Sequence, residues 1–444
     1  MKVIRLAVAV ACAIGLGLAP LTAKAQTPQT ASDIATYVVR PGDTLYDLAE
    51  RYMVRPGDAQ RVARLNRIAE PRRLQPGTTL RIPVRLLRTE PVVARLSAFR
   101  GDVTITAPAG PLAPVIGLVI PEGSRLTTAA GAFLTLEMPD GSRITLPSQS
   151  RVVLDRARRV LLSGDIQRRL TLEAGRSSSV VAPAPTPGSS FIITTPLTVS
   201  AVRGTEFRVA HDAEANRSTL EVVEGSVGAR ASYEASEILV PRAFGRRADA
   251  TSATAPQALL PSPKLRAPGR AQDEPELSFD LVPVDGAQSY RGQLATDAGF
   301  VDIFAEAESE GPTLTFGSVP NAIYFLRLTA IAVDGLEGLP EVYAVERRLN
   351  AIGLAPPAGL EGVDRSFLFR WSDSGEGAAS FRFQLAVNAE MDGPIIDEPG
   401  LTERQISVAE LPDGVYFWRV LVTRFEDGRA SEKWSPVQRF QLGG

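Results

Sequence analysis

Apolar and polar residues alternate over much of this chain, and turn residues separate the alternating runs. Apolar side chains occupy every second position from Leu134 to Met138 and again from Ile144 to Leu146. A Pro-Asp-Gly-Ser turn lies between these two runs. An apolar residue at every second position is typical of a strand with one buried face, so this segment predicts a β-hairpin.

The segment 37–87 has a different pattern. A short apolar run at Tyr37 leads into a Pro-Gly-Asp turn, after which apolar residues recur at helical spacing from Leu45 to Tyr52. Thr44 and Asp47 have the spacing of a capping box, in which both side chains satisfy amides at a helix start. A second Pro-Gly-Asp turn, a second amphipathic run and a final strand before Pro83 follow. The predicted order is strand, helix, helix, strand.

This module resembles the LysM family. The residues that carry the resemblance are Tyr37-Val38-Val39-Arg40-Pro41-Gly42-Asp43-Thr44-Leu45, Leu48-Ala49, Tyr52, Leu65-Asn66, Leu74, Pro76-Gly77 and Leu80-Arg81-Ile82-Pro83. The resemblance implies binding of N-acetylglucosamine glycans, chiefly peptidoglycan and chitin, in a shallow groove between two loops. The implied glycan-binding residues are Gly42, Asp43, Thr44, Leu45, Asn66, Arg67 and Ile68.

An acetamido sugar offers a carbonyl, an N–H and a methyl group. Main-chain groups at a tight turn can bond the first two, and a Leu or Ile side chain can contact the methyl. The alternative is purely structural: Thr44 and Asp47 cap a helix and Asn66 closes one.

Residues 91–244 predict a second module made almost wholly of strands. Strand-then-glycine units recur at 170–176 and 220–226, which favours a rolled or helical β architecture. Residues 191–227 resemble the FecR domain through Ile192-Ile193-Thr194-Thr195-Pro196, Ala201-Val202-Arg203-Gly204-Thr205-Glu206-Phe207-Arg208-Val209 and Val222-Val223-Glu224-Gly225-Ser226-Val227. In that family the domain lies in the periplasm and relays a signal through a membrane helix. We expect no such helix in this chain, so the signalling role is not carried over with the domain. Arg203 and Glu206 form either a recognition patch or a solvated strand–turn face.

The remaining sequence predicts a linker and a tandem repeat. Residues 245–258 are rich in Ala, Arg, Ser and Thr without periodicity, which is typical of a flexible linker. Segments 259–350 and 351–444 repeat each other: Gln293-Leu294-Ala295 recurs as Gln384-Leu385-Ala386, Ile323-Tyr324-Phe325-Leu326-Arg327 as Val415-Tyr416-Phe417-Trp418-Arg419, and Phe279 as Trp371. Both segments resemble fibronectin type III or immunoglobulin-like β-sandwiches, in which the aromatic residues Trp371, Tyr416 and Trp418 form the core and not a ligand platform.

The first 25 residues have the pattern of a secretory signal peptide. Lys2 and Arg5 precede an apolar run that ends at Leu18, and Ala23-Lys24-Ala25 forms a cleavage site. No later segment approaches the length of a transmembrane helix. We therefore expect a periplasmic or secreted protein with no transmembrane segment in the mature chain.

Charge is unevenly distributed along the chain. The net charge is +6 over residues 37–88, +5 over 89–272 and −15 over 273–444. The basic first module favours encounter with the carboxylates of peptidoglycan stems. The overall charge of −2 argues against nucleic-acid binding.

The sequence offers little for catalysis. The single cysteine is Cys12 and the single histidine is His211, so neither a disulfide nor a Cys/His metal site is expected. His211 lies in a polar run that predicts an exposed loop. We expect no catalytic residue, no metal and no cofactor.

The overall prediction is a multi-domain, mainly β protein. A small βααβ LysM module, a β-rich FecR-like roll and two β-sandwich modules follow one another. The predicted function is that of a non-enzymatic cell-envelope protein that binds peptidoglycan and presents its other modules to envelope proteins. The alternatives are an envelope signal sensor that acts through the FecR-like domain and a wall hydrolase.

Overall fold

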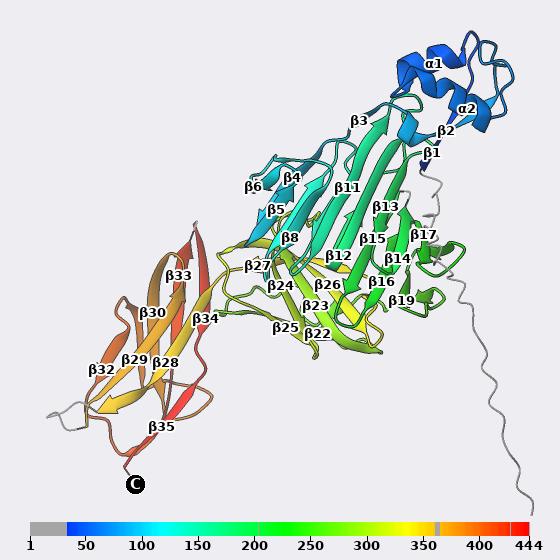
Figure 1. Ribbon diagram of the computed structural model, residues 1–444. Helices are drawn as coiled ribbons and strands as arrows, with labels where there is room; N and C mark the ends of the chain where they lie inside the picture. Colours follow the sequence, from blue (N-terminus) through cyan, green and yellow to red (C-terminus); the bar gives the residue numbers. More distant parts are fainter. Residues whose placement is uncertain (1–32, 203, 360–364, 427, 444) are drawn as a thin grey trace, which may run out of the picture.

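The computed structural model describes residues 33–202, 204–359, 365–426 and 428–443. The expected signal peptide, 1–25, lies outside the described residues, as does Arg203, for which a recognition patch and a solvated strand–turn face are the two alternatives given above. Four modules follow one another from the helical end of the molecule to the C-terminus (Figure 1). The mainly β, multi-domain fold is confirmed.

The N-terminal module has the predicted order of strand, helix, helix and strand. Its elements are β1 (Ile34–Val38), α1 (Leu45–Tyr52), the 3-10 turn η2 (Pro56–Asp58), α2 (Ala59–Leu65), β2 (Thr79–Pro83) and the 3-10 turn η3 (Val84–Leu86). β1 and β2 pair antiparallel, with Tyr37 opposite Leu80. Leu45, Leu48 and Ala49 form the buried face of α1, as their helical spacing predicts.

The second module is one closed, hydrogen-bonded sheet that folds into two layers. Its strands are β3 (Thr89–Pro91), β4 (Ala94–Arg100), β5 (Val103–Ala107), β6 (Gly110–Leu112), β7 (Val119–Ile120), β8 (Ser124–Thr128), β9 (Phe133–Glu137), β10 (Arg143–Leu146), β11 (Arg151–Val160), β12 (Ile166–Val180), β13 (Ser190–Thr194), β14 (Thr198–Val202), β15 (Glu206–Asp212), β16 (Arg217–Glu224), β17 (Ser226–Ala231), β18 (Ile238–Pro241), β19 (Phe244–Asp249) and β20 (Gln257–Ala258). The predicted hairpin is β9–β10, with Leu136 opposite Ile144.

The long strand β12 joins the two layers of this roll. Up to Ala174 it pairs with β11, and from Gly175 onward it pairs with β15. Gly175 has φ +81, and a Cβ there would collide with the main chain of Gln149 and Ser150. Glycine is therefore required at the point where the strand changes partners.

The expected flexible linker at 245–258 is wrong. Residues 244–249 form β19, which pairs with β16, and residues 257–258 form β20. The guanidinium of Arg246 is buried and forms an ion pair with Glu234. An ordered strand with a buried ion pair belongs to the roll, so the roll runs from β3 to β20.

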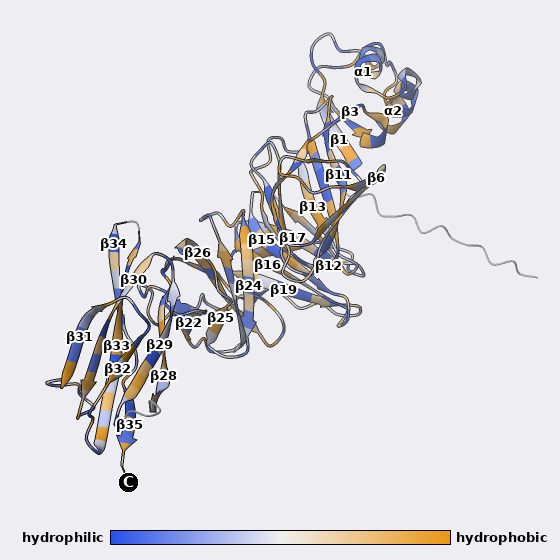
Figure 2. Cartoon of the chain, turned by 90° about the vertical axis from the view of Figure 1, so that its left-hand side faces the viewer, coloured by the Kyte–Doolittle hydropathy of each residue, from blue (hydrophilic) through white to orange (hydrophobic). Residues whose placement is uncertain are grey.

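The last two modules are β-sandwiches with the predicted aromatic cores. The strands of the first are β21 (Lys264–Leu265), β22 (Leu277–Val282), β23 (Ala287–Ala295), β24 (Ile303–Ser309), β25 (Thr313–Phe316), β26 (Ala322–Ala332) and β27 (Glu341–Arg347). Those of the second are β28 (Asn350–Gly359), β29 (Phe367–Gly375), β30 (Ala378–Ala386), β31 (Ile396–Leu401), β32 (Gln405–Val408), β33 (Gly414–Glu426), β34 (Arg429–Trp434) and β35 (Gln438–Leu442). Hydrophobic and hydrophilic bands alternate along these strands (Figure 2).

Corresponding residues of the two sandwiches play corresponding roles. Phe279 and Trp371 are both buried on an early strand. The Tyr324 hydroxyl donates to the Pro320 carbonyl, and the Tyr416 hydroxyl donates to the Pro412 carbonyl. Trp418 is fully buried, so the aromatic residues of the second sandwich form its core, as predicted.

Each module is attached to the next by side-chain contacts. Val160 and Leu162, from the tip of the roll, are buried within the hydrophobic core of the N-terminal module. At the other end of the roll, a cluster of buried side chains joins it to the first sandwich: Phe133, Ala295, Phe300 and Ile303. Between the two sandwiches, the Lys433 ammonium pairs with Asp273 at 3.0 Å, and the Asn321 side-chain amide donates to the Glu426 carboxylate at 2.9 Å. These contacts favour fixed positions for the modules along the molecule.

Candidate functional site

The loop between β1 and α1 is held in one conformation by Asp43. The Asp43 carboxylate accepts a hydrogen bond from the Tyr37 hydroxyl at 2.8 Å and from the Arg40 main-chain N–H at 2.7 Å. Burial, together with the hydrogen bond to Asp43, raises the pKa of Tyr37 to about 12. The neighbouring Gly42 has φ +89 and is exposed. The loop therefore presents Gly42 to solvent on a rigid support.

Thr44 and Asp47 form one half of the predicted capping box, in which the Thr44 side chain bonds a main-chain amide but the Asp47 side chain bonds the Thr44 hydroxyl instead of an amide. The Asp47 N–H donates to Thr44 Oγ1 at 3.1 Å, and Thr44 Oγ1 donates to an Asp47 carboxylate oxygen at 2.7 Å. The side chain of Thr44 thus has a structural role at the start of α1. Any contact of Thr44 with a glycan would be additional to this role.

Leu45 does not have the surface role expected of it. Its side chain is fully buried in the module core. Its N–H already donates to the Pro71 carbonyl at 2.8 Å. Leu45 is therefore not available to contact a sugar, because α1 turns its apolar face inward.

The hydrogen bond from Leu45 to Pro71 has a second consequence. It joins the loop before α1 to the segment that follows α2, and the Arg72 guanidinium lies 6.0 Å from the centre of the Tyr46 ring in the same region. The two segments predicted to flank a groove are therefore in contact.

Asn66 clamps α2 to β2. Its amide nitrogen donates to the carbonyls of Val62 and Arg81, both at 2.9 Å, and its amide oxygen accepts from the Arg81 N–H at 2.7 Å. The two bonds to Arg81 resemble those that a neighbouring strand would form with β2. All of these hydrogen bonds lie within the module. The side chain of Asn66 therefore has a structural role, which is the alternative to glycan contact given above.

Arg67 and Ile68 terminate α2 in a tight turn. Arg67 has φ +56, and the Ile68 N–H donates to the Ala63 carbonyl at 2.9 Å, which is the bonding pattern of a Schellman motif. Arg67 is exposed, and Ile68 packs partly against the core. Of the seven predicted residues, Gly42, Thr44, Arg67 and Ile68 remain available for contact.

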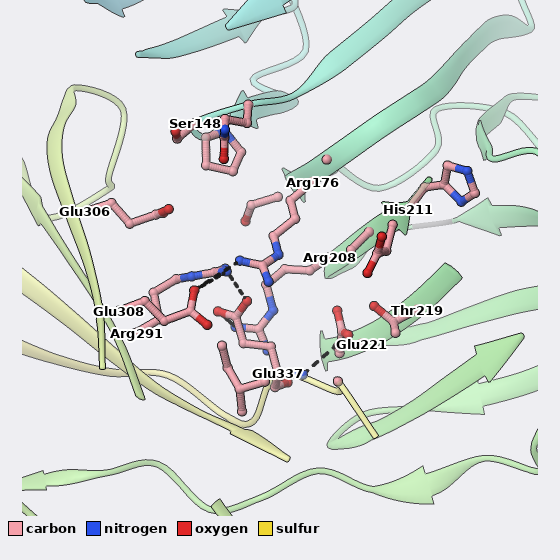
Figure 3. A pocket seen from close by; sticks show the side chains of 18 of the residues that line it. Ser148, Arg176, Arg208, His211, Thr219, Glu221, Arg291, Glu306, Glu308 and Glu337 are labelled. Carbon is pink, nitrogen blue, oxygen red and sulfur yellow. Dashed lines mark hydrogen bonds and ion pairs between the residues drawn. The ribbon is translucent and has the colours of Figure 1, made fainter. Parts of the chain in front are cut away.

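A polar junction between the roll and the first sandwich was not anticipated from the sequence. The Arg208 guanidinium of β15 pairs with Glu337 at 3.2 Å and also donates to the carbonyls of Glu337 and Gly338. Arg291 of β23 pairs with the same carboxylate at 2.7 Å. These side chains meet between the two modules (Figure 3). No short motif could indicate them, because Arg208 and Glu337 lie 129 residues apart.

Two buried carboxyl groups at this junction have pKa values shifted in opposite directions. Burial raises the pKa of Glu221 to about 7, and the nearby Glu337 carboxylate adds to this effect. Arg291 and Arg208 outweigh burial at Glu337 and lower its pKa to about 2. Glu221 is therefore the junction group that titrates near neutral pH.

The raised pKa of Glu221 predicts a pH dependence of stability. Between its ordinary pKa, near 4.5, and its folded value of about 7, the folded protein binds more protons than the unfolded chain. The free energy of unfolding should therefore fall as pH rises through this range, by up to about 3 kcal/mol. Glu221→Gln should remove this loss and be more stable than the wild type at pH 8, but not at pH 5. Urea unfolding at both pH values tests the prediction, and equal pH profiles for the two proteins would contradict it.

His211 differs from its expected position. It lies on β15, not in a loop, and is buried, with Nδ1 3.0 Å from the Ser218 hydroxyl. Burial lowers its pKa. Ser218 is itself fully buried, so this pair fills the roll interior and lacks an exposed nucleophile.

Comparison with protein families identifies two of the modules. The LysM domain family matches residues 37–83. The FecR protein family matches residues 124–228. The chain carries a LysM domain and a FecR domain. Both families consist of binding or sensor domains, and together they indicate an envelope-associated protein.

The LysM match coincides with the module built on β1, α1, α2 and β2. The FecR match lies inside the roll and includes β12, β15 and β16, which form the roll side of the polar junction. Among curated proteins no sequence match is found.

Several solved structures are similar to parts of this chain. Two crystal structures of a putative anti-sigma factor from Parabacteroides distasonis share 18% identity, at a TM-score of 0.25, over 30% of this chain. This chain spans 59% of the length of those proteins. Fibronectin(III)-like modules of Clostridium thermocellum CbhA share 12% identity over 40% of this chain and 93% of theirs, at a TM-score of 0.18. The chicken CNTN1 FN1–FN3 domains share 11% identity over 53% and 97%, at a TM-score of 0.19.

In the described part of the chain, no helix has the length and apolar character needed to cross a membrane.

Proposed function

We propose that this chain is an exported, non-enzymatic envelope protein that binds the N-acetylglucosamine glycan of peptidoglycan through its LysM domain. The observation that carries the proposal is the contact between the loop before α1 and the segment after α2, fixed by the hydrogen bond from Leu45 N–H to the Pro71 carbonyl. Gly42 lies exposed on one side of this contact and Arg67 on the other. The family match over 37–83 supports glycan binding by this module.

The chemistry of this surface suits a neutral sugar polymer. The main chain of Gly42 forms no hydrogen bond with any residue that the structure describes, so its N–H and C=O can pair with an acetamido group. Ile68 is half-buried at the opposite loop and can contact the acetamido methyl. The net charge of +6 over residues 37–88 would favour approach to the stem carboxylates of peptidoglycan.

The modules beyond the LysM domain act in this proposal as a platform held at a fixed distance from the wall. The buried contacts at each junction support this role. A location in the periplasm or outside the cell follows from the same proposal. The partners of the platform are other envelope proteins.

The proposal is tested by co-sedimentation of the full chain with purified peptidoglycan sacculi. We expect the protein to pellet with sacculi and to be released by soluble N-acetylglucosamine oligomers.

An envelope sensor is the second candidate. The observation that favours it is the FecR family match, which covers strands of the roll that contact the first sandwich. A membrane-spanning protein captured by cross-linking to residues 91–244 would support the sensor. Release of muropeptides from sacculi by the purified chain would instead support a wall hydrolase.

A further inference from the structure

The two sandwiches carry the same polar network on one outer face. Arg327 Nε donates to Gln293 Oε1 at 3.0 Å, and Gln293 Nε2 donates to the Glu306 carboxylate at 2.6 Å. In the second sandwich the same three positions are joined at 2.9 and 3.1 Å and are occupied by Arg419, Gln384 and Asp397. The strands that carry these residues, β23 with β26 and β30 with β33, pair in the same register. The repeat therefore extends beyond the core to the surface of one sheet.

The turn at the end of this face is repeated as well. Phe300 has φ +52, Met391 has φ +59, and each side chain is 4% exposed. The Asp297 carboxylate accepts from main-chain N–H groups of the first turn, and Asn388 Oδ1 accepts from the Asp392 N–H of the second at 3.0 Å. A left-handed backbone is rare for a bulky residue, so its recurrence shows that the two turns share an unusual conformation.

The first sandwich is attached to the roll by this face. Its apolar residues Ala295, Phe300 and Ile303 are buried in one cluster with Phe133 of the roll. Two arginines of the roll add ion pairs, since Arg100 pairs with Asp302 at 2.6 Å and Arg208 with Glu337 at 3.2 Å. The docking edge of the roll, Arg100, Phe133 and Arg208, thus combines an aromatic ring with two guanidinium groups.

On the second sandwich the corresponding apolar residues are open to solvent. Ile395 follows Ile303 by the repeat offset of 92 residues and is 51% exposed, whereas Ile303 is 1% exposed. Its neighbour Ile396 packs against the core, so Ile395 points to the outer face. Phe417 lies opposite Ala386 on the same face and is partly exposed. The docking face of the second sandwich, Ala386, Met391, Ile395 and Phe417, thus repeats an interface and lies on a module that extends away from the roll (Figure 1).

The carboxylates beside the docking face are also free. Glu390 and Asp392 are exposed in the repeated turn. Among the described residues, no arginine or lysine nitrogen lies within 4.0 Å of either carboxylate. In the first sandwich the carboxylate of the equivalent turn, Asp302, is paired with Arg100 of the roll. The second turn therefore offers carboxylates that can pair with the arginines of a partner.

We propose that the docking face of the second sandwich binds a second β-roll, supplied by another protein, whose edge carries an aromatic side chain and arginines. This is the chemistry that the docking edge of the roll offers to the first sandwich. The roll of the same chain does not serve, because the first sandwich already covers its docking edge. An apolar centre with charged groups at its rim is the usual composition of a protein interface.

This inference rests on the proposed function in one respect, because it names the class of partner that the platform presents its modules to. It does not depend on the LysM surface. The titration below contains no glycan, so its failure would leave glycan binding untouched. A failure of the chain to pellet with sacculi would likewise leave the docking face untouched.

The test is a titration of the full chain into a fluorescently labelled probe that consists of residues 33–258 of this chain. The probe presents the roll with its docking edge bare. The roll has a closed sheet and a core drawn from its own residues between 94 and 240, so it can fold without the sandwiches. In the full chain the first sandwich is held by its own roll, which leaves the docking face of the second sandwich as the matching surface.

We expect the wild-type chain to bind the probe and Ile395→Glu to bind at least about tenfold more weakly, because the new carboxylate lies within the apolar patch. Val282→Glu is the matched control, since Val282 is 46% exposed in the other sheet of the first sandwich, and its affinity should equal that of the wild type. A probe that carries Phe133→Arg should bind as weakly as the wild-type probe binds Ile395→Glu. Hydrogen exchange in the full chain should slow around residues 386–396 when the probe is added.

Three results would overturn the proposal. One is an absence of binding to the folded probe at about 100 μM wild-type chain, and another is equal affinity in the wild type and Ile395→Glu. The third comes from sedimentation of the full chain alone, which needs no fragment. We expect a monomer there, and a dimer that Ile395→Glu abolishes would show that a second copy of this chain covers the docking face instead.

Discussion

Phe300→Ala should separate the first sandwich from the roll. Phe300 is almost fully buried in a cluster with Phe133, Ala295 and Ile303, and Arg327 lies over its ring. Removal of a buried phenylalanine ring typically costs about 3–5 kcal/mol. Because this cluster spans the junction, we expect the lost stability to weaken mainly the attachment of the first sandwich to the roll.

The left-handed backbone of Phe300 makes this position informative. Its φ is +52, which is rare for a bulky residue, and the Asp297 carboxylate holds the turn by accepting from the N–H groups of Gly299, Val301 and Asp302. The turn therefore holds Phe300 in an unfavourable backbone conformation, which places its ring in the cluster between the two modules.

Scanning calorimetry provides the measurement for Phe300→Ala. The variant should show a separate, earlier transition for the first sandwich that is absent from the wild type. Ile323→Ala is the matched control, because Ile323 is 66% exposed on the same sandwich and should change stability by less than about 0.5 kcal/mol. A wild-type trace for Phe300→Ala would contradict a rigid junction.

Thr44→Arg should abolish most glycan binding, and Thr44→Ala should not. Both substitutions remove the hydroxyl that caps α1, so both should lower the free energy of unfolding by about 1 kcal/mol. Only arginine adds a long side chain between Gly42 and the loop after α2. We expect at least about a tenfold loss of affinity in the arginine variant alone.

Titration of both Thr44 variants with N-acetylglucosamine oligomers checks this result. The alanine variant serves as the control for the lost cap. Equal affinities in the two folded variants would place the glycan elsewhere on the molecule.

Local patterns predicted the LysM module well. Its helix positions followed from apolar spacing, and the N-cap role of Thr44 toward the Asp47 amide followed from a spacing of three residues. Both depend on neighbours in the sequence, so both can be read there. The structure adds the antiparallel pairing of β1 with β2, which the order of elements left open.

Predictions that depended on distant contacts were less complete. Leu45 belongs to a loop motif, but its side chain is buried in the module core. The side chain of Asn66 is hydrogen-bonded to Arg81, a strand residue fifteen positions later. The segment 245–258 lacks periodicity because β19 buries the polar side chain of Arg246 against Glu234. The polar junction arises from two modules, so no single segment could indicate it.

In the proposed function, the LysM surface around Gly42 and Arg67 attaches the whole chain to glycan. In the same proposal, the buried contacts at the junctions hold the other modules in fixed positions relative to this surface.

Co-sedimentation with purified sacculi, in the presence and absence of soluble N-acetylglucosamine oligomers, tests this claim most directly. The account predicts that the full chain pellets with sacculi, that the oligomers return it to the supernatant, and that Thr44→Arg stays in the supernatant throughout. A wild-type chain that stays in the supernatant, or a pellet that the oligomers leave unchanged, would contradict it.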